Sequence, residues 1–273
     1  MLQTPAVVFC AVDAIVPIRG KFLAGFDEFS AALEHAGIPL IWVTRRTRLQ
    51  IDEPRRRLGH THPFICEDGG GTYLPEGYFN IRPIKTMRLG RFTCIPVAEP
   101  QPAAQEALEE LADETAVSVV ALRSLAPREL VQNSGLPARQ AELLRQRDFD
   151  ELFFFAGASE DDVKRFANSA TEKGCELREG EPFWSLTIGS NVTKCVRELS
   201  KLYARALRYQ PKLVAIAKEE DLSGLDRACD RGFILSSKEE SSGTPKPKTG
   251  FRRLLLSAPE FWEEILESIT GKH

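Results

Sequence analysis

The chain has 273 residues, of which 42% are hydrophobic and 27% charged, and its formal net charge is −3. This length suits one large domain or two coupled domains, and the composition is that of an ordinary globular protein. The slightly acidic balance gives no general attraction to nucleic acid or to an anionic membrane surface. No apolar run approaches the ~18–20 residues that span a bilayer, and the N-terminus lacks the pattern of a signal peptide, so a cytoplasmic protein is expected.

The six cysteines are widely spaced, and none forms a C-x-x-C pair. Neither a zinc site nor a disulfide framework is therefore expected. We interpret these residues as buried free thiols in a reducing cytoplasm. They are Cys10, Cys66, Cys94, Cys175, Cys195 and Cys229.

The first strand is predicted at Ala6–Val12, where an apolar run leads into Asp13. A carboxylate at the carboxyl end of a buried parallel strand lies where an open α/β sheet usually places its chemistry. Helices and strands then alternate. The predicted elements are a helix over 22–35, a strand over 38–43 that ends at Thr44, a basic helix over 45–58, a strand over 63–66, and a glycine-rich turn over 67–71 that opens a hairpin. This β-α-β-α-β order predicts a parallel sheet with right-handed crossovers.

The segment 86–190 has a different pattern and is interpreted as a self-contained α+β unit inserted into the first fold. Strands are predicted over 91–97, 117–122, 151–156, 175–178 and 183–188. Helices are predicted over 102–114, 127–134, 137–147 and 159–173. Ser159 is expected to cap the last of these helices, because three acidic residues follow it directly.

The last stretch returns to the α/β pattern, so residues 1–85 and 191–273 are predicted to form one core. Its elements are a helix over 191–207, a strand over 213–217, a short helix over 222–229, a strand over 232–235, a polar linker over 236–249 and a closing helix over 259–269. The whole chain is therefore predicted to be a doubly wound parallel sheet with an inserted α+β domain.

Four stretches of the sequence resemble one known family. They are G-I-P-L-I-W-V-T-R-R-T at 37–47, P-F-I-C-E-D-G-G-G-T-Y-L-P at 63–75, S-G-L-P-A-R-Q-A-E-L-L-R-Q-R-D-F-D-E at 134–151 and V-R-E-L-S-K-L-Y at 196–203. With the order of elements, they resemble the haloacid-dehalogenase-like (HAD) phosphatases with a C2-type cap, and among these the mannosyl-3-phosphoglycerate phosphatases. The resemblance implies a HAD-like core, a C2-type cap over 86–190, and Mg²⁺-dependent hydrolysis of a sugar phosphate monoester.

The resemblance also implies where the catalytic groups would lie. The D-x-D-G-T turn of the family, which holds the aspartate nucleophile and the acid/base aspartate, falls on residues 11–15. The nucleophile position is therefore Ala11, whereas the acid/base position is kept as Asp13. The hydroxyl that holds phosphoryl oxygens is kept as Thr44, followed by Arg46 and Thr47 as in the family.

The remaining catalytic positions depart from the family. The family's lysine at the start of the helix after the cap falls on Val192, and Lys194 stands two residues further on. The G-D-S-x-N-D turn that gives carboxylates to Mg²⁺ falls on residues 217–222, where Lys218 and Leu222 replace the two carboxylates and Asp221 stands at the position of the family's Asn. No metal is expected unless the protein is active, and we hypothesise that Lys218 takes the place of the ion beside Asp13.

Other residues have two readings each. Thr44 could bind an oxyanion or cap a helix that starts at Arg45, and the arginines after it could form a solvated basic face or a substrate clamp. Gly69 and Gly70 match a family turn near the cap hinge and the substrate. Arg147 matches the sugar-binding side of the cap, although an ordinary surface pair with Asp148 is an equal alternative.

A thiol nucleophile at Cys10 is disfavoured, because Cys10 and Ala11 should point to opposite faces of the strand. Three functions remain open. The first is a catalytically impaired or silent relative of mannosyl-3-phosphoglycerate phosphatase that binds a phosphorylated sugar or glycerate. The second is an active phosphosugar phosphatase with an unusual site, and the third is a protein-interaction module whose cleft is closed.

Overall fold

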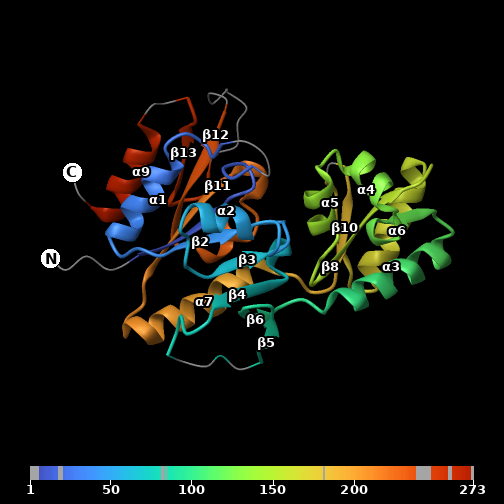
Figure 1. Ribbon diagram of the computed structural model, residues 1–273, viewed down its shortest axis with the longest axis horizontal. Coiled ribbons are helices and arrows are strands. Elements are labelled where there is room, and N and C mark those ends of the chain that lie inside the picture. The colour runs from blue at the N-terminus through green and yellow to red at the C-terminus, as the bar shows by residue number, and fades with distance from the viewer. Residues whose placement is uncertain are drawn as a thin grey trace.

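The computed structural model describes residues 6–17, 21–80, 83, 85–180, 182–237, 247–257 and 260–271. Its two sheets confirm the predicted fold class (Figure 1). Most of the predicted linker, 238–246, and the first residue of the predicted closing helix, Pro259, lie outside the described residues.

The larger sheet has nine strands in the order β13-β12-β11-β1-β2-β3-β4-β6-β5. Neighbouring strands from β13 to β3 are parallel, and the pairs among β3, β4, β6 and β5 are antiparallel. The strands are β1 (Ala6–Ala11), β2 (Leu40–Val43), β3 (Phe64–Cys66), β4 (Gly71–Pro75), β5 (Met87–Leu89), β6 (Phe92–Pro96), β11 (Lys212–Lys218), β12 (Arg231–Ser236) and β13 (Phe251–Leu255).

Strand β1 lies in the middle of the parallel part, between β11 and β2. All six of its residues are buried, which explains the unbroken apolar run in the sequence. Its side chains alternate between two hydrophobic clusters, with Cys10 in one and Ala11 in the other. The predicted opposite orientation of these two residues is therefore confirmed.

Helices cover both faces of this sheet. Side chains of α1 (Phe26–His35) and α9 (Phe261–Thr270) belong to the cluster that contains Cys10, and side chains of α7 (Val192–Leu207) and α8 (Leu225–Ala228) belong to the cluster that contains Ala11. Ring stacking of Phe29 on Trp262, at 4.6 Å between centroids, joins α1 to α9. The short helix α2 is Asp52–Arg57, and single turns of 3₁₀-helix occur at Glu67–Gly69 and Glu219–Asp221.

The smaller sheet has four antiparallel strands in the order β7-β8-β10-β9 and lies apart from the larger one in Figure 1. Its strands are β7 (Val119–Ala121), β8 (Asp150–Phe155), β9 (Glu176–Arg178) and β10 (Trp184–Thr187). Its helices are α3 (Gln101–Thr115), α4 (Pro127–Ser134), α5 (Ala138–Leu144) and α6 (Glu160–Glu172), with a 3₁₀ turn at Leu122–Ser124. Phe153, Phe166 and Leu108 are central to a separate hydrophobic cluster of this cap. As predicted, Ser159 caps α6 by accepting a hydrogen bond from the Asp162 backbone N–H.

Two strands of the predicted insert belong to the larger sheet. Strands β5 and β6 fall within 86–190, but β6 is hydrogen-bonded to β4 and β5 to β6. We therefore propose that the cap begins after β6, close to α3.

The basic helix predicted over 45–58 is wrong for its first half, because only α2 is helical. The Thr47 N–H donates to the Gln50 side chain at 3.2 Å, and the Gln50 N–H donates to the Thr47 hydroxyl at 3.1 Å. These side-chain bonds satisfy the backbone of a turn in place of a helical ladder.

All six cysteines are free and buried, as predicted. Within the described ranges, no helix is both long enough and apolar enough to cross a bilayer.

Candidate active site between core and cap

The carboxyl ends of β1 and β2 face a cleft beneath the cap. A cavity of about 360 Å³ is lined there by Ala11, Asp13, Thr44 and Val192. A larger cavity of about 830 Å³ continues from Asp13 to cap residues such as Leu152 and Phe183. The cleft is therefore formed jointly by the two sheets, as expected for a parallel sheet that binds its ligand at the carboxyl ends of its strands.

The carboxylate of Asp13 is held by four donors from the segment after β2. The Thr44 hydroxyl donates to Oδ1, and the Arg45 backbone N–H donates to Oδ2 at 2.9 Å. The guanidinium of Arg45 approaches Oδ2 at 3.5 Å, and that of Arg46 approaches Oδ1 at 3.3 Å. A hydroxyl, a backbone N–H and two guanidinium groups are donors that suit an oxyanion, so Asp13 occupies the place where such a ligand would be bound.

Arg45 also bridges two carboxylates. Its Nη2 lies 3.3 Å from Oδ1 of Asp221, while its Nε faces Asp13. Burial raises the pKa of Asp221, and the positive charge of Arg45 opposes that rise. One guanidinium therefore compensates two acidic groups at the mouth of the cleft.

The hypothesis that Lys218 pairs with Asp13 is wrong. Among the described residues, the ion-pair partners of Asp13 are Arg45 and Arg46, and none of its contacts comes from Lys218. The segment after β2 is a turn and not a helix, so Arg45 can extend back over the strand ends. For the same reason Thr44 caps no helix at Arg45; its hydroxyl accepts the Arg46 N–H at 3.1 Å within the turn.

Ala11 and Val192 are the residues that the resemblance predicts at the positions of the nucleophile and the lysine. Both are buried and both line the smaller cavity. Lys194 is exposed, is absent from the linings of both cleft cavities, and its backbone N–H donates to the side chain of Asn191 at 2.8 Å. Burial raises the pKa of Cys10 well above its ordinary value, which together with its orientation removes it as a nucleophile.

The described residues do not fit a magnesium ion at this position. Mg²⁺ prefers an octahedral shell of oxygen ligands that includes carboxylates. Lys218 and Leu222 supply none. Of the acids that line the smaller cavity, Asp13 and Asp221 are engaged by Arg45, and Asp68 is paired with Arg178. No group of three or more metal-binding side chains occurs in the part of the chain that the structure describes.

Asp68 reaches the same cleft from the turn after β3. It lines both cavities and forms an ion pair with Arg178 of the cap strand β9. Its φ of +53° is unusual for a residue with a side chain and marks local strain. Burial raises the pKa of Asp68 to about 6, although Arg178 opposes the rise.

A buried carboxylate fastens the cap to this turn. Glu67 is 1% exposed and accepts the backbone N–H groups of Asp148 at 3.1 Å, Phe149 at 2.8 Å and Asp150 at 3.3 Å. Burial and the charge of Asp150 raise the pKa of Glu67 to about 8, against the opposing charge of Arg147. Two acids thus share one guanidinium in a site closed to solvent.

Arg147 is part of this fastening and is not a surface pair with Asp148. Its side chain is 4% exposed and is ion-paired to Asp150. Its Nη2 also donates to the backbone oxygen of Arg45 at 2.7 Å, which links the cap to the segment that holds Asp13. Asp148 is instead bound by Arg48 at 2.8 Å and by the hydroxyl of Tyr73 at 2.7 Å.

The predicted glycines lie at the joint between core and cap. The oxygen of Gly70 accepts the N–H groups of Val97 at 2.9 Å and Ala98 at 3.0 Å, and that of Gly69 accepts the N–H of Asn191 at 3.1 Å. The turn is thus hydrogen-bonded both to the segment that leads into the cap and to the segment that returns from it.

The atoms packed against these two glycines leave no room for a side chain at either position. At Gly69, where φ is +85°, an added Cβ would lie 2.3 Å from the Val192 nitrogen; at Gly70, it would lie 2.7 Å from Phe149. Phe149 itself belongs to the hydrophobic cluster of the larger sheet.

The predicted site residues thus divide into two groups. Asp13, Thr44, Arg46, Arg147 and Asp221 line the cleft. Gly69, Gly70 and Thr47 are outside the linings of these two cavities, and the Thr47 hydroxyl donates to the Leu143 oxygen of the cap at 3.1 Å.

The sequence did not predict three features of the site. They are the ion pairs of Arg45 with both Asp13 and Asp221, and the presence of Asp68 and Arg178 in the cleft. Arg45 directly follows the strand-end threonine and could have been singled out on that ground. Nothing in the local sequence marks Arg178.

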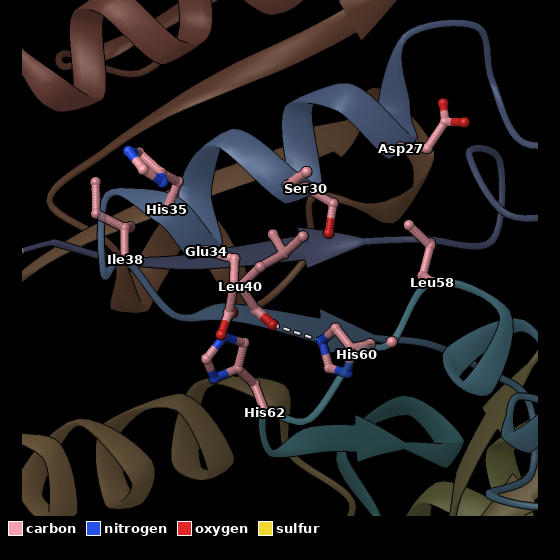
Figure 2. Close-up of a pocket in the computed structure, with 11 residues that line it drawn as sticks. Asp27, Ser30, Glu34, His35, Ile38, Leu40, Leu58, His60 and His62 are labelled. Carbon is pink, nitrogen blue, oxygen red and sulfur yellow. Dashed lines mark hydrogen bonds and ion pairs between the residues drawn. The ribbon is translucent and has the colours of Figure 1, made fainter.

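A cavity of about 390 Å³ lies away from the cleft, between α1 and the segment 58–62 (Figure 2). Glu34 and His62 meet there at 2.7 Å, and the other ring nitrogen of His62 contacts the hydroxyl of Tyr78 at 2.7 Å. His60 contacts the Leu40 oxygen at 2.7 Å. Burial lowers the pKa of His60 to about 3, so this ring is neutral and serves the fold.

The architecture and the cleft define the class of protein. The chain has the fold of the haloacid-dehalogenase-like superfamily in its subclass IIB form, with a C2-type cap over the carboxyl ends of the core strands. No family model matches the sequence. Its distant relatives are named as glucosyl- or mannosyl-3-phosphoglycerate phosphatases.

Two curated relatives illustrate the distance. The chain is 26% identical over 219 residues to the glucosyl-3-phosphoglycerate/mannosyl-3-phosphoglycerate phosphatase of Persephonella marina, with 78% of this chain and 79% of that protein covered. It is 23% identical over 243 residues to the protein of the same name from Methanococcoides burtonii, with 88% of each chain covered.

Solved structures show the same fold at low identity. A HAD-superfamily phosphatase from Bacteroides thetaiotaomicron superimposes with a TM-score of 0.63 at 15% identity, covering 98% of this chain and 96% of that one. A HAD subclass IIB sugar phosphatase superimposes with a TM-score of 0.55 at 15% identity, covering 86% and 89%. The chain is thus similar to sugar-phosphate phosphatases across both core and cap.

Proposed function

We propose that this protein is a relative of the sugar-phosphate phosphatases that does not hydrolyse phosphate esters by the aspartyl-phosphate route. It keeps the cleft between core and cap as a binding site for a small polar ligand of the glycosyl-phosphoglycerate kind. The observation that carries this proposal is the state of Asp13, whose carboxylate takes up the Thr44 hydroxyl, the Arg45 N–H and two guanidinium groups.

The first support is chemical. A methyl group at Ala11 cannot attack phosphorus, and members of a catalytic unit lose their effect together when one is removed. Val192 and Lys218 replace the lysine and one metal carboxylate implied by the resemblance. These departures occur together, as expected when selection no longer maintains hydrolysis.

The second support is electrostatic. Arg45 lies between Asp13 and Asp221, where its single charge compensates two carboxylates without a metal ion. The repulsion between the carboxylates of Asp13 and Asp221 is therefore offset by the guanidinium group of Arg45. Asp13 is then a structural anion, and a general acid/base at this position has no nucleophile to serve.

The third support concerns the ligand. The larger cavity, of about 830 Å³, is lined by basic residues that include Arg46 and Arg147, by acidic residues that include Asp13 and Asp68, and by hydroxyl and apolar groups of the cap. Its volume falls within the range of small-molecule sites. A glycosyl or glycerate group can occupy this space without displacing Asp13 from its donors.

The test combines turnover with binding. Phosphate release from mannosyl-3-phosphoglycerate, glucosyl-3-phosphoglycerate and para-nitrophenyl phosphate is measured with and without Mg²⁺, and no protein-dependent release is expected. Thermal stabilisation by the two glycosyl-phosphoglycerates is measured in parallel, because a ligand stabilises only the state it binds. Turnover that is abolished in Asp13→Asn would refute the non-hydrolytic function, and stabilisation by neither compound would refute the ligand class.

A further inference from the structure

A cluster of arginines surrounds a cavity at the opposite edge of the larger sheet. This cavity, of about 470 Å³, is lined by Arg55, Arg56 and Arg91 together with Phe92 and Thr61. It adjoins the end of β4, whose Pro75 pairs with Phe92 of β6. Since β4 runs antiparallel to β3, this end of β4 lies away from Asp13 and the cleft.

Arg55 is buried, and among the described residues it forms no ion pair. It is 3% exposed, and its guanidinium lies 4.0 Å from the centroid of the Phe64 ring. Its Nε donates to the ring of His60 at 3.2 Å, and its Nη2 donates to the backbone oxygens of His60 at 3.4 Å and His62 at 2.9 Å. All of these acceptors are neutral, since the lowered pKa of His60 keeps that ring uncharged.

The described part of the chain compensates this charge only in part, because Asp52 acts on it from beyond ion-pair distance. No carboxylate lies within ion-pair distance of Arg55 among the described residues, and its Nη1 makes none of the hydrogen bonds found there. Burial lowers the pKa of Arg55 to about 10, so the group is still a cation at neutral pH. A buried cation is costly unless an anion compensates it.

The neighbouring arginines add further positive charge. Arg56 and Arg91 share a single carboxylate, Asp52, which lies 3.4 Å from Arg56. Glu76 also lines the cavity but is paired with Arg88 at 3.4 Å. Four guanidinium groups thus face two carboxylates, and the excess is concentrated around the cavity.

We propose that this cavity binds the phosphate group of a small organic anion, with Arg55, Arg56 and Arg91 as its ligands. Guanidinium groups present paired N–H donors that match two oxygens of one phosphate. Phe92 and Pro75 give the cavity an apolar wall, which suits the carbon part of such a molecule. This phosphate site is separate from the cleft, and the proposal does not depend on the function proposed for the cleft.

The experiment uses the full chain and inorganic phosphate as the probe. The melting temperature is measured against phosphate concentration at constant ionic strength, with chloride as the compensating ion. Four proteins are compared, namely the unmodified chain, the double variant Arg56→Gln/Arg91→Gln, the double variant Arg128→Gln/Arg139→Gln as a charge-matched control at exposed positions of the cap, and Arg45→Gln as a control for the cleft. Each shift is taken relative to the same protein without phosphate, so a lower starting stability does not affect the comparison.

Phosphate is expected to raise the melting temperature of the unmodified chain and of the two control variants. In Arg56→Gln/Arg91→Gln, the apparent affinity from the titration is expected to fall at least tenfold. Three results overturn the proposal: no stabilisation of the unmodified chain, undiminished stabilisation of Arg56→Gln/Arg91→Gln, or loss of stabilisation in Arg45→Gln. The last result would assign the phosphate to the cleft.

Discussion

Replacing Arg45 by glutamine tests whether its guanidinium stands in for an ion. The change leaves the carboxylates of Asp13 and Asp221 facing each other without the cation between them. The Arg45 side chain is 48% exposed, whereas those of Asp13 and Asp221 are 13% and 9% exposed. Exposed ion pairs contribute ~0.2–1 kcal/mol each, so the loss of two partly screened pairs should cost about 1–2 kcal/mol of unfolding free energy.

For a chain of this size, 1 kcal/mol corresponds to a shift of roughly 2–4 °C in Tm, so Arg45→Gln should melt about 2–8 °C lower than the unmodified protein. The assay is thermal unfolding followed by circular dichroism, with and without millimolar Mg²⁺. We expect Mg²⁺ to return part of the lost stability in the variant, because Asp221 then has lost its ion-pair partner and Asp13 keeps only Arg46, and two carboxylates with less positive charge beside them attract a divalent ion. The Tm of the unmodified protein should not change with Mg²⁺.

Arg88→Gln is the control for loss of an arginine, since its ion pair with Glu76 is exposed and lies outside the cleft. It should shift Tm by no more than about 1–2 °C and show no response to Mg²⁺. The reasoning is refuted if the unmodified protein is stabilised by Mg²⁺ as strongly as Arg45→Gln, or if Arg45→Gln is as stable as the unmodified chain.

Two further predictions concern the joint between core and cap. The pKa of Glu67 is raised to about 8 in the folded protein, so its protonation contributes to the free energy of unfolding. This contribution is fully present below the unfolded pKa near 4.5 and is lost as pH rises through about 8. Between these two pH values, the Tm of Glu67→Gln should therefore fall less steeply than that of the unmodified protein. A slope unchanged by the substitution would show that other groups carry the pH dependence. Gly69→Ala should cost about 3 kcal/mol or more in denaturant unfolding, because its Cβ would overlap the backbone of Val192, whereas Gly77→Ala, also at positive φ but in open space, should cost only about 1 kcal/mol. Equal losses in the two glycine variants would contradict the close approach at Gly69.

The sequence was most informative where burial is complete on both faces of the sheet. Strands β1 and β11 are continuous apolar runs, because parallel strands covered by helices face water on neither side. Strand β13 was missed, since it lies at the sheet edge and only Phe251 and Leu254 of its sequence F-R-R-L-L are buried, which gives neither an apolar run nor a strict alternation. The strand predicted over 91–97, which is β6, was placed in the cap because sequence order alone does not show which sheet an antiparallel strand joins, and β5 was not predicted.

The same distinction applies to the site. The grouping of Ala11, Asp13, Thr44 and Val192 around one cavity follows from the order of elements, since the carboxyl ends of neighbouring parallel strands meet at one edge. The partner of Asp13 did not follow from it. Whether Lys218 or Arg45 reaches that carboxylate depends on the conformation of a turn, which the Thr47 and Gln50 side chains determine.

The fastening of the cap by Glu67 limits how this protein can be taken apart. The two sheets suggest two modules, yet Phe149 packs in the hydrophobic cluster of the core and the Glu67 carboxylate is satisfied by three amides from the cap side. Removing the cap and joining residue 98 directly to residue 191 would leave a void under Gly70 and Gly71 and a buried acid without donors. Such a shortened chain should therefore not fold, and domain transplantation between relatives would have to carry residues 67–71 and 147–150 together.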